Sequence, residues 1–328
     1  MTRNAIVFGG TGFIGSHLIE KLCSDNNSVR CISKDYLNSD QLEKLNIEFI
    51  KGDLLNGSVS EDLFFDIDVV FHVAGITHAK TRKEFYDGNY LATKKLIECC
   101  INAKSKIKRF VYMSSLTAVG PSIDGSEVDE TTPYHPVSDY GMSKMMAEYE
   151  ILKYRNKIPI SIVRPSAVYG PRERDMYMYM KSIKNGVQLL IGFNKKYLNL
   201  IYVDDLVDGI ITAAEHNNAE DQIYFLGSQT SYPNEEIGKA IAEILNRHPL
   251  NIHLPHCMVF GICGIEELIG KICNKQMYLN TQKARELIQN RWACSIEKAK
   301  SQLGFNPHIS LYEGFLKTFT WYKKMGWL

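Results

Sequence analysis

The sequence predicts an α/β protein built on a doubly wound, mostly parallel sheet. Short runs rich in β-branched and aromatic residues alternate with segments of helical periodicity, which is typical of parallel strands joined by helices. The first run, 5–8, is followed at once by the string Gly9-Gly10-Thr11-Gly12-Phe13-Ile14-Gly15 and then by an amphipathic segment, 13–23. A strand, a glycine-rich turn and a helix in this order form a cradle for a phosphate group.

Each predicted element follows from this alternation. We expect six strands in the first half of the chain, at 5–8, 29–33, 48–51, 69–73, 110–114 and 159–163. The helices expected between them cover 13–23, 41–45, 59–64, 85–103 and 138–154. Ligands of doubly wound sheets bind beyond the carboxyl ends of the strands, so motifs directly after a strand carry the most weight.

After Arg164 the alternation loosens, and the chain of 328 residues is too long for one ordinary core. We therefore predict a dinucleotide-binding domain at 1–165 and a smaller lobe at 166–328 that binds substrate and shares elements with the first. Within 166–328 we expect a strand at 199–203 and helices near 175–184, 204–215, 234–245 and 311–324.

Composition excludes several classes of protein. A net charge of +1 gives no electrostatic reason to expect a nucleic-acid partner. The eight cysteines form no CxxC pair and the nine histidines show no ligand spacing, so we expect reduced thiols, a cytoplasmic location and no metal. Segment 257–272 is apolar but is interrupted by Glu266, Glu267 and Lys271, so we expect no transmembrane helix. A helix that is buried or covers the second lobe and a contact with a membrane surface both stay open for it.

The glycine string satisfies two dinucleotide spacings, G-x-G-x-x-G from Gly10 and G-x-x-G-x-x-G from Gly9. No Gly-Lys-Ser/Thr follows, which excludes a Walker loop. The alternative is a turn that is only structural. The strand before the string and the helical pattern after it favour the dinucleotide site.

A reactive group of residues follows the fifth predicted strand. Ser114 and Ser115 end that strand, and Tyr140 and Lys144 follow on the next long helix, one turn apart on one face. A phenol with an ordinary pKa near 10 is a poor acid–base group at neutral pH, but a nearby ammonium stabilises the phenolate. Tyr-x-x-x-Lys occurs four times in the chain, so only the position after the strand-end serines selects the Tyr140 pair.

Together these motifs resemble the extended short-chain dehydrogenase/reductase family over nearly the whole chain. Further matches are Gly52-Asp53-Leu54, His72-Val73-Ala74-Gly75, Asn89, Arg164–Pro171 and Tyr202–Leu206. The resemblance implies a Rossmann sheet, a nicotinamide cofactor and a proton relay. His72 is expected to be a packed strand histidine, and Asp204-Asp205 to cap a helix.

The resemblance also implies a role for each matching residue. The catalytic set is Ser115, Tyr140, Lys144 and Asn89. The cofactor-binding set is Gly9, Thr11, Gly12, Phe13, Ile14, Gly15, Ser33, Lys34, Asp53, Leu54, Val73, Ala74, Gly75, Ser114, Tyr140, Lys144, Pro165 and Val168. Candidate substrate contacts are Thr77, His78, Tyr169 and Arg172. A homodimer through 85–103 and 138–154 is implied as well.

The end of the second strand bears on cofactor choice. An acidic residue there would bind the ribose hydroxyls of NAD(H), whereas this chain has Ser33 and then Lys34. A hydroxyl and an ammonium favour NADP(H), with NAD(H) as the alternative.

Three positions bear on the substrate. Members that act on nucleotide sugars resemble one another in an asparagine and an arginine where this chain has Ala167 and Leu198. Sugar dehydratases need an Asp-Glu pair where this chain has Leu116-Thr117. We therefore expect the branch that resembles 3β-hydroxysteroid dehydrogenases and dihydroflavonol reductases, acting as a reductase of lipophilic or small ketones or as a secondary-alcohol dehydrogenase. Met176–Met180 could line its apolar pocket or simply pack on the sheet. The alternatives are a nucleotide-sugar 4-epimerase that retains NAD and a non-catalytic sensor.

Overall fold

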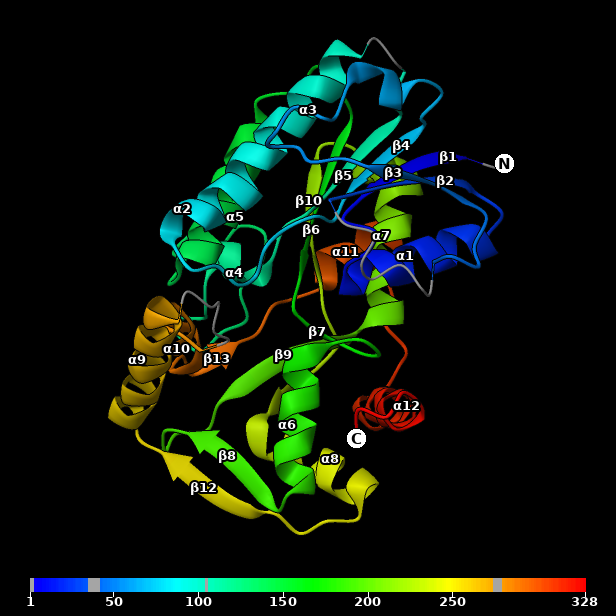
Figure 1. Ribbon diagram of the computed structural model, residues 1–328. Coiled ribbons are helices and arrows are strands. Elements are labelled where there is room, and N and C mark those ends of the chain that lie inside the picture. Colours follow the sequence, from blue (N-terminus) through cyan, green and yellow to red (C-terminus); the bar gives the residue numbers. More distant parts are fainter. Residues whose placement is uncertain (1–2, 35–41, 104–105, 274–278) are drawn as a thin grey trace.

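The computed structural model describes residues 3–34, 42–103, 106–273 and 279–328. Its centre is a parallel sheet of seven strands in the order β10-β6-β5-β4-β1-β2-β3 (Figure 1). The strands are β1 (Asn4–Phe8), β2 (Ser28–Ser33), β3 (Ile47–Lys51), β4 (Val69–His72), β5 (Arg109–Met113), β6 (Ile160–Pro165) and β10 (Gln222–Leu226). The predicted fold class, a doubly wound parallel sheet, is confirmed.

Helices cover both faces of this sheet. They are α1 (Phe13–Ser24), α2 (Arg82–Phe85), a π-helical turn (Tyr86–Leu91), α3 (Ala92–Asn102), α4 (Leu116–Val119), α5 (Asp139–Leu152), α7 (Val203–Glu215), α11 (Glu297–Leu303) and the 3₁₀ turns Glu61–Phe64 and Asn217–Ala219. Alternate residues of β1 enter opposite layers: Val7 packs with Leu18 of α1, whereas Ile6 packs with Leu96 of α3. A buried strand with two apolar faces is what a helix-covered parallel sheet requires.

A second group of elements lies at the carboxyl edge of the main sheet (Figure 1). It consists of β7 (Ala167–Tyr169), α6 (Arg174–Lys184), β8 (Val187–Ile191), β9 (Tyr197–Tyr202), β11 (Ser231–Pro233), α8 (Asn234–Leu245), β12 (Leu250–Leu254), α9 (His256–Ile272), α10 (Thr281–Leu287), β13 (Arg291–Trp292) and α12 (Leu311–Lys324). Strands β11, β9, β13 and β7 form one small sheet, and β12 with β8 another.

Two sequence-based expectations need correction. The seventh strand, β10, was missed, although it pairs with β6 over five residues. A helix was expected at 41–45, of which residue 41 lies outside the described residues; 42–45 form turns instead.

The predicted helix 85–103 is divided by the π-helical turn Tyr86–Leu91. Gly88 lies within this turn, where a Cβ atom would stand 2.9 Å from the Ile76 side chain. The missing side chain lets the turn approach the loop after β4. This approach brings Asn89 to that loop.

The exposure of helix α9 bears on the alternatives for segment 257–272. The segment is helical from His256 to Ile272, but only Val259, Cys263 and Gly270 are buried. It is therefore not a buried helix. No helix within the described ranges is long and apolar enough to cross a membrane.

Candidate active site

The glycine string forms a tight turn between β1 and α1. Gly9 has a φ of +87°, and a Cβ atom there would lie 2.6 Å from the backbone of Ala74. A Cβ atom on Gly15 would lie 2.1 Å from the carbonyl oxygen of Gly9. Only glycine tolerates these approaches.

The amino end of α1 fits a negatively charged ligand. Helix α1 begins at Phe13, no side chain caps it at Gly12, and its first turn contains no acidic residue. The free N–H groups and the helix dipole at this end favour an anion. These residues of the chain therefore suit the pyrophosphate of a dinucleotide.

The ends of β2 and β3 lie beside the glycine turn. The hydroxyls of Thr11 and Ser33 are hydrogen-bonded at 2.7 Å. Lys34 Nζ lies 3.2 Å from Asp53 Oδ1, which also accepts a hydrogen bond from the Leu55 amide at 2.8 Å. Burial raises the pKa of Asp53, but the Leu55 amide and the Lys34 ammonium outweigh it and lower the pKa below its ordinary value. The ends of β2 and β3 thus present the hydroxyls of Thr11 and Ser33 and the ammonium of Lys34, which is paired with the Asp53 carboxylate.

The loop after β4 is fixed by Asn89. Its side-chain oxygen accepts from the Ile76 amide at 2.8 Å, and its nitrogen donates to the Ile76 carbonyl and to Ser143 Oγ, both at 3.0 Å. A Cβ atom on Gly75 would lie 2.9 Å from Lys144 Nζ. Asn89 therefore ties the Val73-Ala74-Gly75 segment to α5, which is a positioning role.

Ser115 and Tyr140 are brought together by the packing of α5 on α4. Ser138 caps α5 by accepting from the Gly141 amide at 3.1 Å. Gly141 has no side chain, and a Cβ atom there would lie 2.3 Å from the Thr117 carbonyl oxygen. This close approach places Tyr140 beside Ser115, whose hydroxyl is near enough to lower the pKa of the phenol.

Burial dominates the proton affinities at the site. It raises the pKa of Tyr140 to about 12; the hydrogen bond with Ser115 acts in the opposite direction, and the charge of Glu286 adds to the rise. It lowers the pKa of Lys144 to about 8, against the pull of Glu148. Lys144 Nζ donates to the Met113 carbonyl at 2.9 Å. The net shift of the Tyr140 pKa is therefore upward in the chain without a cofactor, because desolvation of the phenolate is its largest cause.

The other three Tyr-x-x-x-Lys pairs lie elsewhere, and Lys94 of the Tyr90 pair is 4.0 Å from Glu150. Lys181 donates to Tyr177 at 3.2 Å, and Tyr177 packs on Trp327. Tyr149 is 50% exposed, and Lys153 pairs with Glu150 on the same helix. Within the described chain only the Tyr140 pair meets a strand-end serine.

A buried ion pair lies directly beneath the site. Arg164 Nη2 is 2.7 Å from Glu148 Oε2, and the two side chains are 1% and 0% exposed. Ser114 donates to Glu148 as well, so its hydroxyl could meet a cofactor only as an acceptor. His72, at the end of β4, is fully buried. Its Nε2 is hydrogen-bonded to Thr93 Oγ1 at 2.7 Å, and burial lowers its pKa to about 3. The prediction of a packed strand histidine is confirmed.

Two of the four predicted substrate residues are engaged elsewhere. Tyr169 is 1% exposed and packs on Phe315 and Tyr202, so its ring belongs to the core. Arg172 has a φ of +77° and donates to Ser16 Oγ and Glu20 Oε2, both at 2.6 Å, so it fastens the chain after β7 to α1. The remaining two, Thr77 and His78, are hydrogen-bonded to each other at 2.9 Å in the loop after β4.

One other local expectation is wrong. Tyr202, not Asp204 or Asp205, is the N-cap of α7, and Asp205 instead accepts from the amides of His308 and Ile309. Of the two alternatives for Met176–Met180, packing describes most of the stretch, since Met180 is fully buried and Met176, Tyr177 and Tyr179 pack on the core, whereas Met178 is 53% exposed.

Sequence reasoning missed α10, which lies against the start of α5. Glu286 accepts from Ser138 Oγ at 2.6 Å, and Gln282 accepts from the Asp139 amide at 3.1 Å. Lys283 pairs with Glu286 at 3.3 Å, and its charge also reaches His78. Some 140 residues separate α10 from α5, and no motif links them. The cap residue Asn280 before a short helical pattern was the available signal.

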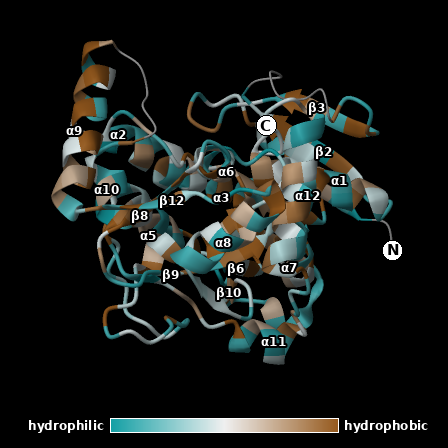
Figure 2. Ribbon diagram, turned by 90° about the horizontal axis from the view of Figure 1, so that it is seen from below, coloured by the Kyte–Doolittle hydropathy of each residue, from teal (hydrophilic) through white to brown (hydrophobic). Residues whose placement is uncertain are grey.

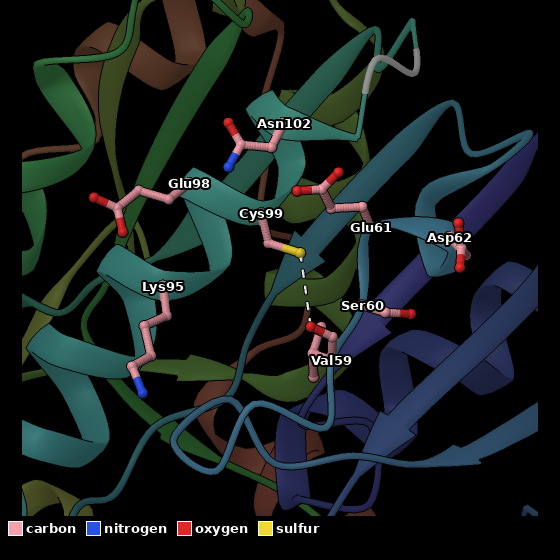
Figure 3. A pocket seen from close by; sticks show the side chains of 8 residues that line it. All are labelled: Val59, Ser60, Glu61, Asp62, Lys95, Glu98, Cys99 and Asn102. Atoms are coloured by element: carbon pink, nitrogen blue, oxygen red, sulfur yellow. Dashed lines mark hydrogen bonds between the residues drawn. The ribbon is translucent and has the colours of Figure 1, made fainter.

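A surface hollow lies away from these residues. It is lined by Val59, Ser60, Glu61, Asp62, Lys95, Glu98, Cys99 and Asn102, between the 3₁₀ turn at 61–64 and α3 (Figure 3). None of the predicted site residues lines it. The described residues also contain no cluster of three or more His, Cys, Asp or Glu side chains arranged to hold a metal.

The fold, the glycine turn and the Ser115–Tyr140–Lys144 group define an NAD-dependent enzyme of the extended short-chain dehydrogenase/reductase type. The chain belongs to the NAD dependent epimerase/dehydratase family, whose sequence model matches residues 5–227.

Relatives in this family differ in their reactions. The chain is 28% identical to dTDP-D-glucose 4,6-dehydratase of Dictyostelium discoideum, over 98% of this chain and 82% of that protein. It is 23% identical to the decarboxylating sterol-4-alpha-carboxylate 3-dehydrogenase of Mus musculus, over 96% and 90%. The structure resembles UDP-glucuronic acid 4-epimerase from Bacillus cereus in complex with NAD, with a TM-score of 0.81, 23% identity and coverage of 98% and 99%.

Proposed function

We propose that this chain interconverts a secondary alcohol and the corresponding ketone at Ser115, Tyr140 and Lys144. The observation that carries the proposal is that Tyr140, Lys144 and Ser115 meet at the carboxyl edge of the sheet: α5 packs closely on α4 at Gly141, Lys144 donates to the Met113 carbonyl, and Ser115 is near enough to act on the pKa of Tyr140. A nicotinamide bound over Gly75 would supply or accept the hydride.

Each residue has a separate task in this proposal. Tyr140 gives the proton to, or takes it from, the substrate oxygen, and Ser115 holds that oxygen beside the phenol. Lys144 binds the cofactor ribose and, as an ammonium, favours the phenolate. Asn89 holds the loop after β4 against α5, through its hydrogen bonds with Ile76 and Ser143.

The comparisons favour a nucleotide-sugar 4-epimerase over the ketone reductase expected from the sequence. Similar proteins include enzymes of dTDP-glucose and UDP-glucuronic acid, the second solved with NAD. A dehydratase is less suitable, because the position of its Asp-Glu pair holds Leu116 and Thr117 and Thr117 donates to Ser115 at 2.8 Å. The first candidate is therefore an epimerase that keeps its cofactor bound.

A ketone reductase remains the second candidate because of two side chains. Ala167 on β7 and Leu198 on β9 stand where an asparagine and an arginine would bind a sugar diphosphate, and both strands belong to one small sheet. Neither residue offers a hydrogen bond or a positive charge to a phosphate. An apolar substrate suits them better, and the sterol dehydrogenase among the relatives acts on one.

One experiment separates the two candidates. The purified protein is denatured to release and quantify bound nicotinamide, and is incubated with UDP-glucose, UDP-glucuronic acid and a panel of ketones. Retained NAD with a 4-epimerised sugar supports the epimerase. Loss of NADPH with a ketone supports the reductase. If wild type and Tyr140→Phe give the same result with every substrate, the proposed site is wrong.

For a cofactor that exchanges freely, we propose a preference for NADP(H), with NAD(H) as the alternative. Ser33 offers a hydroxyl and Lys34 a cation near the ribose, and Thr11 shares the hydrogen bond of Ser33. Ser33→Asp is expected to weaken NADPH binding by about ten-fold or more relative to NADH, because a carboxylate repels the 2′-phosphate. Fluorescence titration of both cofactors measures this; tighter NADH than NADPH binding by wild type would contradict the preference.

The remaining expectations stay proposals. We place cofactor binding mainly in 1–165 and substrate binding mainly in 166–328, in a cytoplasmic homodimer joined through α3 and α5. Helices α3 and α5 lie side by side on one face of the main sheet, which supports a shared surface (Figure 1).

A further inference from the structure

Helix α9 carries an apolar stripe on its outer side. Met258, Ile262, Ile265, Ile269 and Ile272 follow one another at alternating spacings of four and three, so they share one face of the helix. Each of these side chains is between 40% and 75% exposed. Figure 2 shows the helix at the margin of the molecule, with many of its residues hydrophobic.

The two carboxylates of α9 are turned toward the protein, whereas Lys271 is exposed. Its inner side packs Val259 and Cys263 on Ala284. Glu267 accepts from the amide and hydroxyl of Thr281 and from Lys271, and Glu266 accepts from the Leu279 amide. Carboxylates inside and aliphatic side chains outside reverse the usual pattern of a helix on a water-exposed surface.

The apolar surface continues on the β8–β12 pair next to α9. Leu189 and Ile252 are register partners, so they lie on one face of the pair, and they are 45% and 36% exposed. Their neighbours on that face, Ile191 and Leu254, pack under α9. Leu250 and Phe193 at the two ends are 68% and 75% exposed. Contiguous apolar patches of this kind mark contacts with proteins or membranes.

The charge around this surface favours a membrane over a second copy of the protein as its partner. Segments 184–196 and 246–258 contain Lys184, Lys195, Lys196 and Arg247 and no Asp or Glu. All of these cations except Lys196 are exposed. In a two-fold contact with a second copy the patch would meet its own positive rim, whereas an anionic lipid surface complements it.

We propose that α9 and the β8–β12 pair dock on the surface of a bilayer that contains anionic lipid. The helix would lie in the plane of the interface, with its stripe among the acyl chains and Lys184, Lys195 and Arg247 at the headgroups. The proposal is independent of which substrate the active site takes.

Vesicle sedimentation tests it with the full chain. Wild type is expected to sediment with vesicles of phosphatidylcholine and phosphatidylglycerol and much less with phosphatidylcholine alone. Ile265→Glu with Ile272→Glu should reduce binding by at least about ten-fold, since two apolar side chains are lost from the contact. Lys195→Glu with Arg247→Glu should reduce it by about five-fold for each cation removed.

The matched control is Ile123→Glu, which places the same charge at another isoleucine, 82% exposed. It should sediment as wild type does, and thermal unfolding should show that every variant is folded. Two results would overturn the proposal. In the first, wild type binds neither kind of vesicle; in the second, sedimentation velocity shows that wild type self-associates while the α9 variant is monomeric. The second result would assign the patch to a second copy.

Discussion

Tyr140→Phe is expected to reduce turnover by about 10²–10⁴-fold, the usual contribution of a positioned acid–base group. The change removes one oxygen atom and leaves the ring in contact with Phe85. Cofactor binding should be unchanged, because the glycine turn, Ser33 and Lys34 are untouched. Steady-state kinetics together with cofactor titration measure both effects.

The matched control is Tyr149→Phe, on the same helix and in the same Tyr-x-x-x-Lys spacing. Tyr149 is 50% exposed, and its neighbour Lys153 pairs with Glu150. This variant should keep full activity. A Tyr140→Phe enzyme with near wild-type turnover would remove Tyr140 from the proton-transfer step.

Glu148→Leu is expected to destabilise the fold by about 3–5 kcal/mol, because it leaves the charge of Arg164 buried without its partner. Arg164 is 1% exposed and makes three hydrogen bonds to the two carboxylate oxygens of Glu148. The carboxylate also holds Ser114 and Tyr134. Chemical denaturation followed by circular dichroism gives the free energy of unfolding.

Two further variants make this prediction specific to the buried pair. Glu48→Gln breaks the exposed Arg30–Glu48 pair, in which Glu48 is 56% exposed, and should cost less than about 1 kcal/mol. Glu148→Leu combined with Arg164→Met should recover much of the lost stability, since no uncompensated charge remains. If Glu148→Leu has the same free energy of unfolding as wild type, the buried charge of Arg164 does not require Glu148 as its partner.

Local chemistry explains why some elements could be predicted. Adjacent residues are enough to predict the strands at 29–33 and 110–114, which are rich in β-branched or aromatic side chains. The spacing of the glycines is enough to predict the turn at Gly9–Gly15. Strand β10 was missed because it depends on β6 for pairing.

The active site divides in the same way. The sequence could propose Ser115 and the Tyr140–Lys144 pair because they follow a predicted strand and match the pattern of the family, and their proton-transfer role stays a prediction. The roles of Tyr169 and Arg172 could not be predicted, because burial against Phe315 and hydrogen bonds to α1 depend on contacts between distant segments.

By itself the sequence determined six strands of the sheet and the glycine turn, since periodicity and spacing act over a few neighbouring residues, and it predicted the proton-transfer residues. Only the tertiary structure decided what surrounds them. The desolvation that raises the pKa of Tyr140, the arrival of Glu286 from α10 and the outward turn of the α9 isoleucines all depend on packing between segments far apart in the chain. Burial and long-range charge have no signature in local sequence, because they are properties of the assembled interior.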